Sequence, residues 1–533
     1  MSEQNYYAAD AAMSEPKYKI TDSAMIEELK QCSDEIERRF IALRDKLNIN
    51  LDIAKFQHPL DKEIIGDSGI LGKLSIDGDK KTIAYSNADQ LDKLWIKLLE
   101  KSIICLRFFD KREPFLNNPQ KTIIAYGIDN LNDYHRRYTD FESLMYGASS
   151  YYRDHVFHAI RVWFLGVFCL IKPMQKEDVN NSAREPFIDS ITLDGGAFLD
   201  EDDINFFEKI SMWTIIALCH DLGYPLEKAD QIIEKTRKMM KEFIPSPNVW
   251  NNFGYSGVQD SINEYILKFI STKMKPCSES NKKYFGRIQP KYYLKYAKSL
   301  EHFQHGIISA VIIYKMLLYF LESDFNLNDD YVYEQEDARQ FYIRREILRA
   351  IASHTCPDAY NIHITTFSSL LFLCDELQEW GRKSWNELYT GLSDSSISLA
   401  IYYFEPRGIE VSENISMEGI KVEDKQIVID NIVRVFKRQY SLYKTTFRDG
   451  QDTAKRDFDL KKTMKFCLPS NGATNQSILV SFALLAQGKN EFSIQFSNLK
   501  KEDKKKYTDD IRGQVERLQY GSDLKFVEKV DEI

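Results

Sequence analysis

Histidine and aspartate recur at the ends of apolar stretches in the middle of this sequence. Seven of the nine histidines lie between residues 155 and 363, and one of them, His220, stands directly before Asp221 and after the run "WTIIALC". His158 opens a similar run, and Asp375 follows "FSSLLFLC". A carboxylate beside an apolar helix is costly to bury unless it is paired or coordinated. Convergence on a divalent cation would remove this cost: Mn, Fe, Zn and Co suit mixed nitrogen and oxygen ligands, and Mg suits the oxygen-rich side.

Two further histidines could take part in this chemistry. His305 lies three residues after His302, so the two side chains share one face of a helix. His354 ends an apolar run shortly before Pro357, which stops a helix. An imidazole titrates near neutral pH, so His305 and His354 could each bind a metal or transfer a proton. The alternative for His354 is a helix-end residue without a catalytic role, since cations are favoured there.

The segments that must position these residues are predicted to be helices. Apolar residues recur at helical spacing in six central stretches: 155–172, 206–222, 258–272, 298–322, 337–354 and 364–388. Before them, the sequence predicts a helix at 23–47 and a short hairpin at 69–86. After them, β-rich stretches flank one helix, and these stretches are 396–405, 408–415, 476–487 and 491–497, with the helix at 426–447.

These patterns predict a mainly α fold. We expect a mainly helical N-terminal region at 1–144, a helical bundle at 145–395 and a smaller α+β C-terminal domain at 396–533.

Composition limits the class of protein. Of the 533 residues, 43% are hydrophobic and 28% are charged, as in a soluble globular protein with a large core. The longest apolar stretch, at 162–171, is about half the length that spans a bilayer, and the polar start does not resemble a leader, so we expect a cytoplasmic protein without membrane contact. The eight cysteines form no CxxC pair and are expected to be reduced.

Charge limits the partners. The net charge of −9 argues against stable nucleic-acid binding. The basic run "LKKEDKKKY" at 499–507 is interleaved with acids and is predicted to be a solvated face.

The order His158, His220–Asp221, Asp375 resembles the H…HD…D signature of the HD-domain superfamily of metal-dependent phosphohydrolases. "HAIRV", "CHDLGYP" and "LLFLCDELQEWGR" resemble its first, second and last motifs, and the resemblance covers about residues 145–395. It implies that His158, His220, Asp221 and Asp375 hold a divalent metal ion (Mn, Fe, Mg, Co or Zn). The ion would lower the pKa of a bound water and polarise a phosphoryl oxygen, and Asp221 could also orient the attacking water.

The segment "HGIIS" narrows the resemblance. It places His305 and Ser309 as in the H-x-x-x-S segment of deoxynucleoside triphosphate triphosphohydrolases, whose histidine contributes to catalysis. Asp221, His305 and His354 are therefore the expected catalytic residues. If His305 and His354 both bound metal, a two-metal centre like that of cyclic-dinucleotide phosphodiesterases would form.

The expected activity is hydrolysis of deoxynucleoside triphosphates to deoxynucleoside and triphosphate. The alternatives are cleavage of a cyclic mono- or oligonucleotide and a nucleotide-binding regulator with a degenerate site. Tyr224 does not decide between these activities, because triphosphohydrolases have His at this position and HD-GYP phosphodiesterases have Lys, and this chain has neither.

The remaining expectations concern partners. Arg161, Lys228 and Arg382 lie near the metal motifs and could hold phosphate groups, or could be ordinary salt-bridge residues. Tyr224 could contact a sugar or simply pack. Besides the nucleotide substrate, the resemblance implies an allosteric nucleotide effector, a homo-oligomer, and service in antiviral defence or nucleotide homeostasis.

Overall fold

The structure is a computed structural model. The residues it describes are 18–49, 51–78, 81–112, 122–148, 154–175, 185–193, 204–243, 258–277, 282–322, 326, 331–356, 362–382, 396–416, 425–447, 458–468, 476–484, 490–517 and 524–528.

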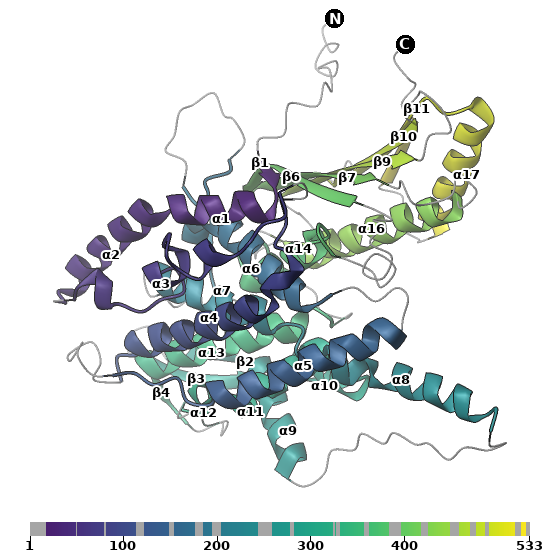
Figure 1. Ribbon diagram of the computed structural model, residues 1–533. Helices are drawn as coiled ribbons and strands as arrows, with labels where there is room; N and C mark the ends of the chain where they lie inside the picture. The colour runs from purple at the N-terminus through teal and green to yellow at the C-terminus, as the bar shows by residue number, and fades with distance from the viewer. Residues whose placement is uncertain are drawn as a thin grey trace, which may run out of the picture.

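Helices form most of the described chain (Figure 1). The first group is α1 (Asp22–Gln31), α2 (Ser33–Leu47), α3 (Lys62–Ile65), α4 (Ala88–Phe108) and α5 (Ile128–Ala148). The central group is α6 (Val156–Ile171), α7 (Phe206–Cys219), α8 (Tyr224–Met240), α9 (Val258–Ser271), α10 (Pro290–Glu301), α11 (His305–Met316), α12 (Leu318–Leu321), α13 (Gln335–Ser353) and α14 (Phe367–Leu377). The last two are α16 (Lys425–Thr445) and α17 (Lys501–Arg517). Single 3-10 turns occupy Ile53–Lys55, Leu71–Lys73, Tyr85–Asn87 and Phe187–Ser190.

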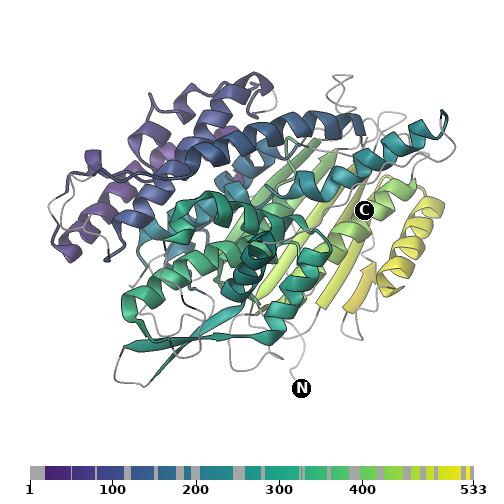
Figure 2. The same cartoon turned by 90° about the horizontal axis from the view of Figure 1, so that it is seen from below.

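Strands form one large sheet and two small ones. The large sheet has seven strands in the order β1 (Tyr18–Ile20), β6 (Ser396–Glu405), β7 (Gly408–Ser416), β9 (Asp459–Leu468), β10 (Gln476–Leu484), β11 (Asn490–Ser497) and β12 (Leu524–Glu528). The small sheets are β2 (Thr272–Pro276), β3 (Lys283–Ile288) and β4 (Tyr333–Glu334), and the pair β5 (Ile362–His363) and β8 (Thr446–Phe447). In the large sheet, β7–β9 and β11–β12 are parallel and the other pairs antiparallel. Helices α16 and α17 lie along one face of it (Figures 1 and 2).

The two most buried helices of the centre are α6 and α7. Every residue of both is buried, so neither has a solvent-facing side. Helix α7 begins at a capping box, in which Asn205 accepts from the backbone of Glu208 and the Glu208 side chain accepts from the backbone of Asn205. Polar side chains on these helices must therefore be satisfied inside the protein.

Four of the predicted central helices are confirmed. The predictions at 155–172, 206–222, 258–272 and 337–354 correspond to α6, α7, α9 and α13. Among the described residues, no helix is both long and apolar enough to cross a bilayer.

The predicted single helix at 298–322 is wrong, because the chain breaks twice there. Phe303 has a left-handed φ of 50° and separates α10 from α11. Leu317 is extended, with φ −96° and ψ 112°, and separates α11 from α12. After the first break, α11 begins at His305.

Other predictions need smaller corrections. The helix at 23–47 is divided at Cys32 into α1 and α2. The hairpin at 69–86 is reduced to one bridge between Ile76 and Ile83 in the described residues. The helix at 364–388 ends at Leu377 as α14, and 383–388 lie outside the described residues.

The predicted mainly α fold with a smaller β-containing part agrees with the structure. The four β-rich stretches after residue 395 form β6, β7, β10 and β11, and the helix among them is α16. The sheet also includes β1 from the N-terminal region, paired antiparallel with β6. The three-part division at 144 and 395 stays a prediction, and β1 links its first and last parts.

Candidate metal centre

Five helix ends meet at one buried cluster of histidines and aspartates. His220 is the C-cap of α7, His354 is the C-cap of α13, and Asp375 lies in the last turn of α14. His158 lies in the first turn of α6, and His305 is the first residue of α11. Three helices thus point their negative C-terminal ends at the cluster and two point their positive N-terminal ends at it, so helix dipoles alone give a cation little net advantage.

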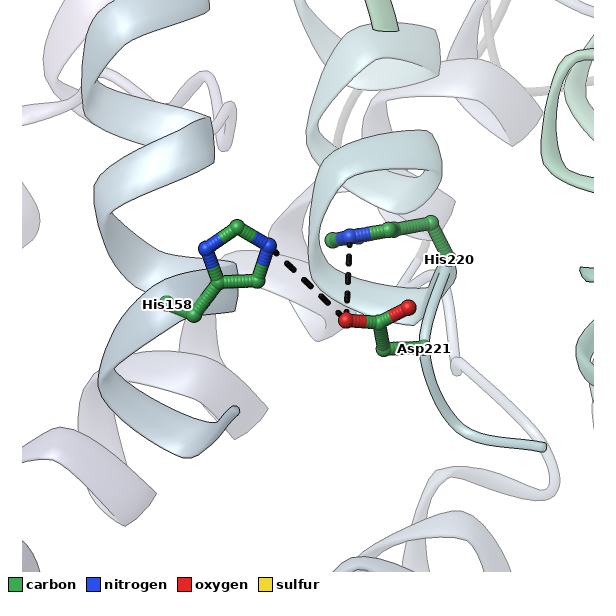
Figure 3. Close-up of side chains that lie close together, drawn as sticks. All are labelled: His158, His220 and Asp221. Atoms are coloured by element: carbon green, nitrogen blue, oxygen red, sulfur yellow. Dashed lines mark ion pairs between the residues drawn. The ribbon is translucent and has the colours of Figure 1, made fainter. Parts of the chain in front are cut away.

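The first set of side chains contains the four residues of the H…HD…D pattern. His158 Nε2 lies 2.9 Å from Asp375 Oδ1 and 3.8 Å from Asp221 Oδ2. His220 Nε2 lies 3.3 Å from Asp221 Oδ2 and 3.8 Å from Asp375 Oδ1. Figure 3 shows both imidazoles turned toward the same oxygen of Asp221. Ligands of one cation at about 2.1 Å lie up to about 4.2 Å apart, so these separations suit a shared metal.

A second set uses the other oxygen of the same carboxylate. Asp221 Oδ1 lies 3.2 Å from His305 Nε2 and 3.5 Å from His354 Nε2. The ligand atoms within each of the sets His158–His220–Asp221 and Asp221–His305–His354 lie within 4.8 Å of one another. Asp221 thus belongs to two groups that could each hold a metal ion.

The other ring nitrogen of each histidine fixes the direction of the imidazole. His220 Nδ1 donates to the carbonyl of Ala217 at 2.8 Å, and His354 Nδ1 donates to the carbonyl of Ile351 at 2.6 Å. A carbonyl only accepts, so Nδ1 carries the proton in both rings and the neutral ring offers a lone pair at Nε2. Within the described part of the chain, both Nε2 atoms are buried and have no hydrogen-bond partner. A metal ion fits this donor set, since it would satisfy the two atoms that the protein leaves unpaired.

His158 is oriented by a side chain in place of a carbonyl. Its Nδ1 bonds to Oε1 of Gln378, the C-cap of α14, and Gln378 Nε2 donates to the carbonyl of Trp380 at 2.8 Å. The amide is therefore held with its oxygen toward the imidazole. Gln378 was not predicted from the sequence; its position three residues after Asp375 was the only available signal.

His305 differs from the other three because its partner is a carboxylate. Glu227 Oε2 lies 2.6 Å from His305 Nδ1 and accepts from the His305 backbone N–H at 2.9 Å. The other oxygen of Glu227 is bonded to Lys228. Glu227 is thus a functional candidate that sequence reasoning missed; it follows Asp221 by six residues, on a helix that was not predicted.

The charged side chains of the cluster lie close enough together to shift one another's pKa values. Burial alone would raise the pKa of Asp221, but the charge of His220 and the imidazoles of His305 and His354 that face its other oxygen hold this pKa well below its usual value. Burial alone would lower the pKa of His305, but hydrogen bonds to Asp221 and Glu227 raise it to about 9. For His354, burial prevails and lowers the pKa.

Close backbone packing explains the "HGIIS" segment. Gly223 donates its N–H to Ser309 Oγ at 2.8 Å, and Ser309 Oγ donates to the His305 carbonyl at 2.8 Å. A Cβ on Gly223 would lie 2.4 Å from the His305 carbonyl oxygen, and one on Gly306 would lie 2.6 Å from Thr355 Oγ1. Ser309 and Gly223 therefore hold α11 against the turn that carries Asp221, and Gly306 lets α11 approach the end of α13 closely.

The four predicted substrate-binding residues have different surroundings. Arg161 is buried, its Nε donates to both oxygens of buried Asp22 at 3.2 and 3.1 Å, and Nη1 donates to the Gly381 carbonyl at 3.0 Å. That guanidinium joins α1, α6 and the segment after α14. The other three lie beside the cluster of histidines and aspartates.

Tyr224, Lys228 and Arg382 border the cluster. The Tyr224 ring stacks on His155 with 4.0 Å between centroids, and its edge contacts His305 at 5.4 Å. Lys228 Nζ lies 5.1 Å above the Tyr224 ring. Burial alone would lower the pKa of Arg382, but nearby carboxylates, Glu379 first, raise it. Its Nε has no hydrogen-bond partner among the residues that the structure describes.

Comparisons with protein-family models, with curated proteins and with solved structures found no match for this chain.

Proposed function

We propose that this chain is a divalent-metal-dependent phosphohydrolase that acts on a nucleotide. The observation that carries the proposal is the sharing of Asp221. Its two oxygens face two separate sets of histidines, and each set has a buried Nε2 atom that finds no hydrogen-bond partner among the described residues. His158, His220, Asp221 and Asp375 would hold one cation, and Asp221, His305 and His354 would hold a second.

Bound cations would supply a Lewis acid for the phosphoryl oxygens, an activated water and, as a pair, stabilisation of both the attacking and the leaving oxygen. The protein itself supplies orientation and charge. Backbone carbonyls and Gln378 fix the imidazole rings, and the Arg382 guanidinium offers an unsatisfied N–H to a phosphate group. Tyr224 and His155 form a stacked wall beside His305.

Two neighbouring sets of ligands favour phosphodiester cleavage of a cyclic mono- or oligonucleotide, because a pair of cations can stabilise both the attacking and the leaving oxygen. Hydrolysis of deoxynucleoside triphosphates to deoxynucleoside and triphosphate is the second candidate. The observation that favours it is the Glu227–His305 pair, because a carboxylate-supported imidazole can pass a proton at Nε2 to a leaving oxygen when it is not itself a ligand.

An activity screen separates these readings. The purified protein would be incubated with Mn, Mg, Co, Fe or Zn and with each deoxynucleoside triphosphate, singly and mixed, each nucleoside triphosphate, or cyclic mono- and dinucleotides, and products would be resolved by chromatography. Linear nucleotides from cyclic substrates establish the phosphodiesterase, whereas nucleoside plus triphosphate establishes the triphosphohydrolase. Nucleotide binding without turnover under every metal would contradict both and favour a regulator.

Matched variants test whether the centre is responsible. Asp221→Ala removes the shared carboxylate and is expected to abolish turnover. Asp189→Ala removes a carboxylate in an exposed ion pair with Arg39 and is expected to retain it. Equal activity in the two variants would refute the assignment of the centre.

We further propose that the protein works in the cytoplasm as a homo-oligomer with a nucleotide effector, in antiviral defence or nucleotide homeostasis. Light scattering after size exclusion, with and without added nucleotides, tests the oligomer and the effector. A monomer under all conditions would refute the oligomer, and turnover that no added nucleotide changes would refute the effector.

A further inference from the structure

A basic segment lies between α9 and α11, in a chain that is acidic overall. Residues 272–302 contain eight Lys or Arg and two Glu, although the whole protein carries a net charge of −9. Much of this charge lies on the β2–β3 hairpin, which runs along the edge of the helical body in Figure 2. This part of the surface is therefore cationic although the net charge of the protein is negative.

The register of the hairpin places its cations on one face. Lys273 pairs with Arg287, and Lys275 pairs with Phe285. Cross-strand partners and residues two apart share a face of a sheet, so these four side chains lie together, and Lys283 lies two residues from Phe285 on the same side. We call these five residues the cationic face.

The opposite face of the hairpin is buried. Thr272, Met274 and Tyr284 point inward, and the Met274 backbone N–H donates to Tyr342 Oη at 2.9 Å. Tyr342 belongs to α13, the helix that ends at His354. The inner face thus fixes the hairpin to the body, so the cationic face points away from it.

The cationic face is poorly neutralised. Lys283 lies 3.4 Å from Glu334, and both side chains are at least half exposed. In the part of the chain that the structure describes, Lys273, Lys275 and Arg287 have no ion-pair partner. Like charges directly opposite each other destabilise a strand pair, so the Lys273–Arg287 pair costs stability until an anion binds between them.

We propose that the cationic face binds single-stranded nucleic acid. Its cations would contact successive phosphates, and the half-buried Phe285 ring among them would stack on a base. An anionic membrane surface suits this face less well, because no large apolar side chain other than Phe285 lies on it. The proposal does not depend on the metal centre.

Fluorescence anisotropy of a labelled 20-nucleotide oligo(dT) tests it, with the full-length protein in EDTA so that hydrolysis cannot interfere. We expect binding at low salt, with log K falling against log salt with a slope of about −2 for three phosphate contacts. No binding at low salt, or equally tight binding to a duplex of the same length, would overturn the proposal. Binding to phosphatidylserine vesicles but not to the oligonucleotide would also overturn it.

Two variants locate the surface. Arg287→Glu places opposite charges across the strands, so we expect binding to weaken about tenfold while the melting temperature stays equal or rises. Phe285→Ala is expected to weaken single-strand binding about tenfold with an unchanged salt slope. The control Lys505→Glu makes the same charge change at an exposed position of α17 and is expected to bind like the wild type. An equal loss in Arg287→Glu and Lys505→Glu would refute the cationic face as the site.

Discussion

Replacement of His354 by Gln tests whether the second set, Asp221–His305–His354, holds a metal ion of its own. His354 belongs only to the second set, where its Nε2 lies 3.5 Å from Asp221 Oδ1. A glutamine side chain has a similar reach, but its amide is a weaker ligand than an imidazole for transition metals. We expect the wild type to bind two cations per chain and His354→Gln to bind one, because the first set stays complete.

The effect of His354→Gln on the free energy of unfolding can be estimated, because a ligand that binds only the folded state stabilises that state. One cation at 100 times its dissociation constant stabilises the folded state by about 2.7 kcal/mol, so two contribute about 5.4 kcal/mol and the variant loses about half of this. Without metal, His354→Gln loses the hydrogen bond to the Ile351 carbonyl, which costs about 1 kcal/mol. The metal-dependent part is the difference between unfolding free energies measured with and without metal.

The assay has two readouts. Protein stripped with a chelator is reconstituted with Mn, desalted and analysed for metal content by mass spectrometry, and urea unfolding is followed with and without Mn. His363→Gln is the matched control, because His363 bonds to Thr365 Oγ1 at 2.6 Å and belongs to neither set. One cation per wild-type chain, or two in His354→Gln, would refute the second set.

Three further predictions address the support of the centre and the rest of the fold. Glu227→Gln removes the charge behind His305, so turnover is expected to fall about 10- to 100-fold in a steady-state assay with the metal content unchanged; unaltered kcat would refute a supporting role. Gly306→Ala places a Cβ 2.6 Å from Thr355 Oγ1, so urea unfolding should show a loss of about 1–3 kcal/mol, and an unchanged midpoint would contradict the packing described. Burial lowers the pKa of His58 from 6.5 to about 3, so the unfolded chain binds its proton first as pH falls; stability should drop by about 1.4 kcal/mol per pH unit below 6.5. The free energy of unfolding, measured with urea at pH 7, 6 and 5, should therefore fall less with decreasing pH in His58→Gln than in the wild type. An equal decrease in the two proteins would contradict a neutral His58.

The residues at the centre of the site were accessible to sequence reasoning, and the structure brings them together. His158, His220, Asp221 and Asp375 each lie at the end of an apolar helix, where a polar residue is conspicuous against its neighbours. Their role as metal ligands stays a prediction. Glu227 could not be recognised in this way, because it lies on α8, whose sequence is polar over most of its length, and so it does not differ from its neighbours.

Elements of the fold were missed where tertiary contacts override the local pattern. Strand β9 buries Lys462 in its inward row, where it pairs with Glu413 at 2.7 Å, and this interrupts the alternation of apolar and polar residues. The break before α11 depends on Phe303 in a left-handed conformation, which no local signal favours for this residue type. The polar helix α17 was predicted only as a solvated basic face, and its buried residues are few.

The arrangement of the imidazoles argues for a bound cation over a purely structural role. A buried histidine that only closed a helix end would bond one nitrogen to a carbonyl of the last turn and find a second partner for the other. His220 and His354 satisfy the first condition and leave the second unmet, at neighbouring helix ends that share Asp221. An unpaired buried polar atom costs about 1–3 kcal/mol, and two of them facing one carboxylate raise that cost without any packing benefit. A cation between them would remove the cost and balance the charge of Asp221 and Asp375 together, which is why the shared carboxylate carries the assignment.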